Sequence, residues 1–268
     1  MKRISITLLF CLFLGLSSFH KIAKAPTELQ SKEKELFQVS TINALMLGIL
    51  DGDYTYESLM KKGNYGIGTF QDADGEMIAL DGNFYQIDYD GKISLVRPSQ
   101  VTPFAQVVFF KPTAKFPLKD QKSMQATTQS ILPEFINKNI PHAVFLKGKF
   151  SQMKVRSIAA QQKPYPSFLE VTQQQRVFQK NEVEGMAFGF WFPEYLDGIG
   201  VGGMHLHFLS EDHQFGGHIL DFSASDISVS IQPLFEYQIH LPDVQSFSEA
   251  DLDQDLHTEI DQAEGNAL

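Results

Sequence analysis

Four of the eight histidines in the chain fall within the fourteen residues from His205 to His218. His205 and His207 are two residues apart, and residues two apart on a β-strand project from the same face. An antiparallel partner strand that begins at His218 would bring a third imidazole opposite them. A catalytic zinc ion usually has three protein ligands, such as neutral histidine nitrogens, and a fourth coordination position that is open to water or substrate. The sequence therefore predicts a site for zinc or another divalent ion at His205, His207 and His218.

Two other residues of this stretch need to be weighed. His205, His207 and Glu211 approximate the metal-binding pattern of cupin barrels, although the glycine spacings on both sides differ by one residue. On that interpretation Glu211 replaces His218 as a ligand, and the protein is a cupin-like metal oxygenase or isomerase. His213 is out of register with the strand positions and is expected to face solvent. A third interpretation is a non-catalytic exported module that binds a metal or another ligand.

The elements expected to position these residues are mostly short strands. Asp-Gly pairs separate alternating runs between residues 66 and 96, a strong signal for an antiparallel meander. The fold class expected is mixed α and β, with two domains built on mixed, largely antiparallel sheets and few helices. The Gln-, Lys- and Pro-rich stretch 161–166 is the expected seam between an N-terminal mixed-sheet domain, 26–160, and a C-terminal metal-binding sheet domain with an acidic tail, 161–268. Helices are expected at 41–50 and 54–62, at 121–137 with an interruption or end at Pro133, and in the tail around 252–260.

Residues 1–25 have the order of a secretory signal: two basic residues, an apolar run from residue 4 to residue 16, and then small residues. This run of thirteen residues is too short to cross a membrane core, which needs about twenty apolar residues. We therefore expect this segment to be removed, leaving an exported protein, periplasmic or extracellular, without a membrane attachment. The single cysteine, Cys11, would leave with it, so the mature chain would have no disulfide.

The acidic balance of the chain limits its partners. The net charge is -10, and removal of residues 1–25, which carry four positive and no negative charges, changes it to -14. Such a surface repels phosphate backbones, which argues against nucleic acid as a partner. An anionic substrate would need local positive charge, supplied by a metal ion or an arginine.

Several motifs in the same order give the chain a resemblance to the acetolactate decarboxylase family over nearly all of its mature length. The motifs are TINALMLGILDGDY at 41–54, GIGTF at 66–70, GEMIALDGNFYQ at 75–86, VRS at 155–157, and MHLHFL followed by GGH between 204 and 218. The resemblance implies a two-domain α/β enzyme, often a homodimer, that converts 2-acetolactate to acetoin and carbon dioxide. It also implies the site residues: zinc ligands at His205, His207 and His218, functional side chains at Glu76, Arg156 and Glu264, and a threonine near the substrate at Thr69.

These implied roles suit the chemistry. Loss of carbon dioxide from a 2-hydroxy-3-keto acid leaves an enediolate, and zinc chelated by the keto and hydroxyl oxygens would stabilise its negative charge. The planar guanidinium of Arg156 suits a substrate carboxylate. The enediolate must then accept a proton on one face, for which Glu76 and Glu264 are the candidates. Either glutamate would alternatively approach the metal directly, and without the resemblance both would be interpreted as glutamates that face water.

Overall fold

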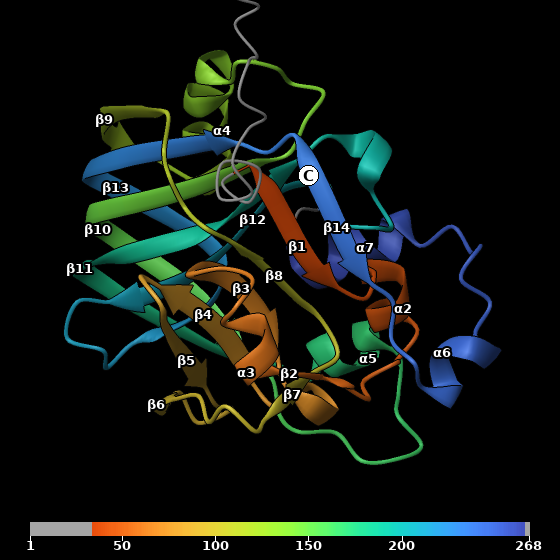
Figure 1. Cartoon of the computed structure of the whole chain (residues 1–268). Coiled ribbons are helices and arrows are strands. Elements are labelled where there is room, and N and C mark those ends of the chain that lie inside the picture. The colour runs from red at the N-terminus through yellow and green to blue at the C-terminus, as the bar shows by residue number, and fades with distance from the viewer. Residues whose placement is uncertain (1–33, 266–268) are drawn as a thin grey trace, which may run out of the picture.

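The computed structural model describes residues 34–265, and the strands of this part of the chain form two large sheets and one short strand pair (Figure 1). In the seven-stranded sheet, only the pairing of the two strands at one edge is parallel. Across that sheet lie β14 (Glu236–His240), β1 (Glu35–Val39), β8 (Ala105–Val108), β3 (Tyr65–Thr69), β4 (Glu76–Leu80), β5 (Asn83–Ile87) and β6 (Ile93–Leu95). The short pair is β2 (Tyr54–Thr55) with β7 (Val101–Thr102).

The five-stranded sheet is antiparallel and contains the three longest strands. It consists of β10 (His142–Ser157), β11 (Arg176–Phe192), β12 (Gly203–Ser210), β13 (Gly216–Pro233) and the edge strand β9 (Ala114–Gln121). β10 pairs with both β11 and β13, and β12 also pairs with both, so these four strands form a closed ring of pairings. β12 and β13, which carry the predicted metal ligands, belong to this ring.

The helices are short. They are α2 (Ile42–Met46), α3 (Tyr56–Leu59), α4 (Met124–Ile131), α5 (Phe168–Gln173), α6 (Gln245–Glu249) and α7 (His257–Glu264), with 3₁₀ turns at Gln71–Ala73, Leu132–Glu134 and Glu194–Leu196. The helix expected over 121–137 is shorter than predicted. Its start is later because β9 continues to Gln121 through pairing with β13, and it ends at Ile131, just before the 3₁₀ turn that contains Pro133. The helix expected at 41–50 is also shorter, since it ends before Gly48, whose φ is +78°.

Local sequence explains several of these boundaries. Thr41 accepts a hydrogen bond from the Ala44 backbone and begins α2, while Ser167 and Glu170 form a capping box at the start of α5. Asp81 and Gly82, both with positive φ, make the two-residue turn between β4 and β5. The mixed, largely antiparallel fold predicted from the sequence is confirmed.

Apolar side chains fill the space between the two sheets. Phe188 and Phe190 of β11 are fully buried against Ile67 and Ile78 of the seven-stranded sheet. On β12, Leu206 and Phe208 instead join a second cluster, with Phe150 and other residues of the ring. Because side chains alternate along a strand, His205 and His207 therefore face the seven-stranded sheet.

The predicted division into two domains at residue 160 stays a prediction, but strand pairing crosses that position. β9 and β10, which precede it, belong to the same sheet as β11 to β13, and β14 returns to pair with β1. The predicted secretory signal at residues 1–25 lies outside the described residues, and its removal stays a prediction. Within residues 34–265, no helix is long and apolar enough to cross a membrane.

Candidate active site

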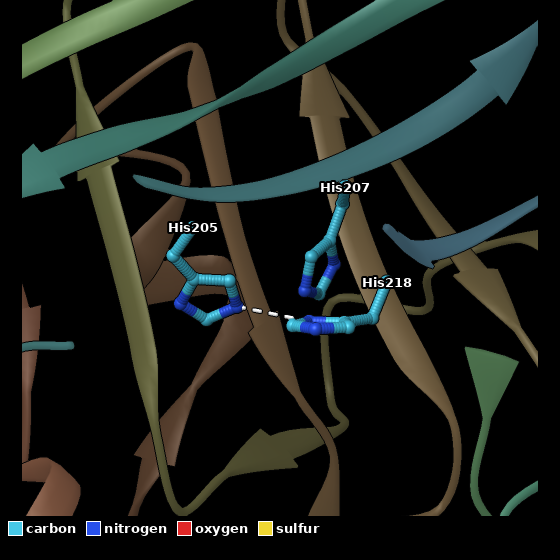
Figure 2. A group of neighbouring side chains, drawn as sticks. All are labelled: His205, His207 and His218. Carbon is cyan, nitrogen blue, oxygen red and sulfur yellow. Dashed lines mark hydrogen bonds between the residues drawn. The ribbon is translucent and has the colours of Figure 1, made fainter. Parts of the chain in front are cut away.

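Three histidines come together on two neighbouring strands, as the spacing predicted. His207 of β12 lies directly opposite His218 of β13, and His205 lies two residues before His207. One ring nitrogen from each lies within 4.8 Å of the others, and the residues are only 7%, 2% and 1% exposed in the order 205, 207, 218. Figure 2 shows the three rings turned toward one another. The arrangement could hold one metal ion.

Two glycines let other strands approach the histidine strands closely. A Cβ atom on Gly189 of β11 would overlap the carbonyl oxygen of His205. A Cβ atom on Gly217 would overlap the carbonyl oxygen of Arg156, and Gly217 has a φ of +142°. Side chains at either position would push apart the backbones that carry the site, so glycine is required there.

Hydrogen bonds orient two of the rings. Nδ1 of His207 donates to the carbonyl oxygen of Met77 at 2.8 Å, which leaves Nε2 with a free lone pair. Nε2 of His218 donates to the carbonyl oxygen of Glu264 at 3.2 Å, which leaves Nδ1 with the lone pair. This Nδ1 lies 3.1 Å from Nε2 of His205. Such outer contacts are typical of metal-binding histidines, because they fix the ring and its tautomer.

The three imidazoles are neutral, as metal ligands must be. Burial lowers the pKa of His205 to about 3, with a further contribution from the nearby Arg156 guanidinium. Burial also holds the pKa values of His207 and His218 well below the usual range for histidine. Three neutral, buried ring nitrogens that point at one another are typical of a site for a divalent metal ion. They are not typical of histidines that only fill a hydrophobic core.

Two carboxylates border the histidines. Oε2 of Glu264 lies 3.3 Å from Nε2 of His205 and 3.6 Å from Nδ1 of His218. Oε2 of Glu76 lies 3.6 Å from Nε2 of His207. Burial raises the pKa of Glu76 to about 8, against the opposing effect of Arg156, and it also raises the pKa of Glu264. Both glutamates are 4% exposed, so the alternative in which they face water is wrong.

Arg156 links these two carboxylates and is itself 1% exposed. Its Nε lies 3.6 Å from Oε1 of Glu76, and its Nη2 lies 3.4 Å from Oε1 of Glu264. Nη1 donates to the carbonyl oxygen of Ala263. Nε has no hydrogen-bond partner among the described residues and is available to donate. The arginine therefore supplies fixed positive charge beside the neutral histidines.

Thr69 borders the same pocket and pairs with Glu76 across β3 and β4. Its hydroxyl donates to the carbonyl oxygen of Gly75 at 2.7 Å. Its own carbonyl oxygen accepts hydrogen bonds from the hydroxyls of Tyr56 and Thr102, at 2.8 and 2.7 Å. Tyr56 and Thr102 were missed by the sequence analysis, since an isolated tyrosine and threonine in short strands or helices carry no distinctive pattern.

The rest of the pocket wall is apolar and was also missed. Ile42 and Leu45 of α2, Phe168 of α5 and Phe104 line it beside the polar residues. In the sequence these four side chains resemble ordinary core residues. The packing of α2, α5 and α7 against one another brings the helical residues to the site.

The competing ligand set is wrong. Glu211 is exposed in the turn after β12, and its carboxylate is not part of the metal-ligand group formed by the described residues. The turn carries it away from the histidine face, and its backbone N–H donates to the carbonyl oxygen of Glu184. His213, also exposed, packs its ring against Tyr85 with 4.9 Å between the ring centroids, as expected for a residue outside the site.

Comparison with known proteins decides the family. The sequence pattern of alpha-acetolactate decarboxylase matches residues 36–254. The chain belongs to the alpha-acetolactate decarboxylase family. The alpha-acetolactate decarboxylase of Brevibacillus brevis is 41% identical over 229 residues, which cover 85% of this chain and 80% of that protein. The one from Methylococcus capsulatus is also 41% identical, over 87% of this chain and 90% of that protein.

Solved structures agree with this family assignment. The crystal structure of alpha-acetolactate decarboxylase from Bacillus subtilis strain 168 superimposes with a TM-score of 0.84 at 33% identity, covering 86% of this chain and 99% of that one. The match to the family pattern ends at residue 254, before α7. The position of Glu264 beside the histidines is therefore known from the structure and not from the match to the family pattern.

Proposed function

We propose that this protein decarboxylates 2-acetolactate to acetoin and carbon dioxide at the site formed by its three buried histidines. One observation carries the proposal: a triple-histidine group, two buried glutamates and a buried arginine line a single pocket in a chain of this family. The residues that line the pocket are buried, and burial strengthens electrostatic interactions with a charged reactant.

His205, His207 and His218 would hold a divalent ion, for which zinc is our proposal. Three neutral imidazoles with an open position suit catalytic zinc, although other divalent ions compete for such sites. When bound, the ion is a Lewis acid that stabilises negative charge as it develops on the substrate oxygens. The ring nitrogens fit this role, since Nε2 of His207 and Nδ1 of His218 each keep a lone pair for a ligand bond.

Arg156 would bind the substrate carboxylate or stabilise charge near it. Among the described residues that line the pocket, it is the only lysine or arginine. Its Nε can donate to an incoming carboxylate oxygen, and Nη1 is anchored on the Ala263 carbonyl oxygen. A charge-assisted hydrogen bond of this kind is stronger than a neutral one.

Glu76 is our proposed proton donor. With a pKa raised to about 8 by burial, its carboxyl holds a proton at neutral pH. Glu264 accepts a hydrogen bond from Arg156, which opposes the rise that burial causes in its pKa. As the bond to carbon dioxide breaks, its electron pair stays on the carbon skeleton, and the Glu76 proton then forms the new C–H bond. A fixed donor on one side would give one acetoin enantiomer.

Export and dimerisation remain proposals that rest on the sequence. The signal-like order of residues 1–25 supports export to the periplasm or the medium. The homodimer is implied by the family resemblance alone. Light scattering of the purified mature chain would decide its oligomeric state, and N-terminal sequencing of the exported product would identify the cleaved bond.

The decisive experiment combines an acetoin assay with elemental analysis of the purified chain. We expect about one divalent ion per chain, the number that a single triple-histidine site holds, and acetoin formation from racemic 2-acetolactate. His205→Ala should lose both the bound ion and acetoin formation, while circular dichroism shows that the protein remains folded. A folded, metal-loaded chain that forms no acetoin would contradict the proposal, and would instead favour the non-catalytic binding module.

A further inference from the structure

The last segment of the described chain closes one side of the site. Residues 241–265, here called the C-terminal arm, follow β14 and include α6 and α7. Figure 1 shows the arm, in blue, running outward past α6 before α7 returns toward the body of the molecule. α7 contacts α5 and α2 and brings Glu264 to the histidines. The arm thus delivers one of the site's two glutamates.

α7 forms part of the wall of the site, through Glu264. Every side chain that lines the pocket is buried, the most exposed being His205 at 7%. The cavity between these side chains has a volume of about 20 Å³. This is room for about one water molecule. A keto-hydroxy acid is larger than one water molecule, so side chains of the wall must shift for it to bind.

Side chains of the body hold the arm near its middle. Nδ2 of Asn43 lies 3.4 Å from the carbonyl oxygens of Leu252 and Gln254. His257, the first residue of α7, donates through Nδ1 to Oδ2 of Asp197. The His257 side chain is 59% exposed and the Asp197 side chain 12% exposed.

Asp197 makes a second contact that ties the arm to the histidine strand. Its Oδ1 accepts a hydrogen bond from the backbone N–H of Gly202 at 3.1 Å. Gly202 directly precedes β12, which carries His205 and His207. One carboxylate therefore holds both the start of α7 and the start of the metal strand.

We propose that Asp197 is a positioning residue, whose carboxylate sets the place of α7, and through it Glu264, relative to the histidines. His257 and Glu264 are seven residues apart, which is about two helical turns, so they lie on one face of α7. Holding His257 therefore fixes the direction in which Glu264 points. Ile260 and Ala263, both buried, complete that attachment. The inference depends on the proposed function at one point, which is that Glu264 acts at the catalytic site.

The tie depends on the charge of His257. The hydrogen bond that it donates to Asp197 raises its pKa, and the carboxylates of Asp261, Asp197 and Asp255 act in the same direction. The arm contains eight Asp and Glu residues and no Lys or Arg, so protonated His257 is its only positive side chain. Because the pKa is raised on folding, the tie is complete below the ordinary histidine value and weakens as pH rises through the raised value.

The test uses His257→Gln and Asp197→Asn in the metal-loaded full chain. The amide of the second variant keeps an oxygen for the Gly202 N–H, so both variants remove charge more than shape. At pH 6 we expect hydrogen exchange of the amides of residues 257–264 to quicken by about two- to fivefold, as for loss of an exposed ion pair. We expect kcat for acetoin formation to fall by a similar factor with little change in KM, since Arg156 and the metal ligands are not on α7. Both differences should shrink as the pH rises through the raised pKa of His257.

Asp90→Asn is the matched control, because it breaks another exposed pair, Arg176–Asp90, far from α7 in the chain. It should leave α7 exchange and kcat unchanged. Unchanged exchange of α7 in both test variants, or a kcat deficit that is the same at low and high pH, would overturn the inference. If the wild-type chain forms no acetoin, the proposed function fails, while the exchange measurement still decides the role of Asp197.

Discussion

The two sides of the site are held in place by different kinds of structure. The histidines lie on β12 and β13, where strand register fixes His207 opposite His218 and backbone hydrogen bonds continue on both sides. Glu264 lies at the end of an eight-residue helix late in the chain, held by packing and a few polar contacts. The comparison indicates a rigid metal platform faced by a more easily displaced helix that carries Glu264. Variants on the two sides should therefore fail in different ways.

The largest effect is expected on the platform. His207→Ala removes one of three nitrogens and leaves a buried gap, so we expect the metal content of the chain to fall well below that of the wild type. Acetoin formation should fall by more than the ~100-fold that loss of an outer-shell partner of a metal ligand typically costs. Elemental analysis and a steady-state assay measure the two quantities. His213→Ala, an exposed histidine from the same stretch, should change neither.

A smaller effect is expected on the arm. Glu264→Gln keeps the size of the side chain and removes the ionisable carboxyl group that faces Arg156. We expect kcat to fall by about 100-fold, the lower end of what positioned acid-base groups contribute, while metal content stays at the wild-type value. Metal loss as complete as in His207→Ala would show instead that Glu264 is a ligand, and the division between the two sides would disappear.

The smallest expected change is in the stability of the fold beneath the platform. Gly189→Ala places a Cβ atom against the His205 carbonyl oxygen, so β11 and β12 must separate. We expect the free energy of unfolding to fall by about 1–3 kcal/mol, as for other overpacked interiors, measured by urea titration. Gly202→Ala is the control, since the nearest atom to its added Cβ would lie at 3.4 Å. Equal losses from both substitutions would argue against a special role for the β11–β12 contact.

Sequence patterns predicted the local parts of the platform well. The two-residue spacing of His205 and His207 is enough to place them on one strand face, and Asp81-Gly82 is enough to predict a hairpin. Patterns were less successful where distant contacts decide. The start of the helix predicted over 121–137 was wrong because pairing with β13 holds Gln121 in a strand, and Glu211 matched a metal pattern although its turn faces solvent.

The remaining site residues came from family resemblance, because nothing local distinguishes them. Glu76, Arg156 and Glu264 have no common spacing, and each alone suits an exposed surface position. Their pKa shifts and ion pairs exist only because three separate segments bury them together. The same holds for the Asp197–His257 contact, which joins residues sixty positions apart.

By itself, the order of residues determined the histidine pair, the turns and the largely antiparallel class, since these depend on contacts between near neighbours. Tertiary structure alone decided that Ile42 and Phe168 form the pocket wall, that Arg156 stands between two buried carboxylates, and that α7 covers the histidines. The physical reason is that burial and charge are properties of the surroundings, and here those surroundings are assembled from β3, β4, β10, β12, β13 and the C-terminal arm.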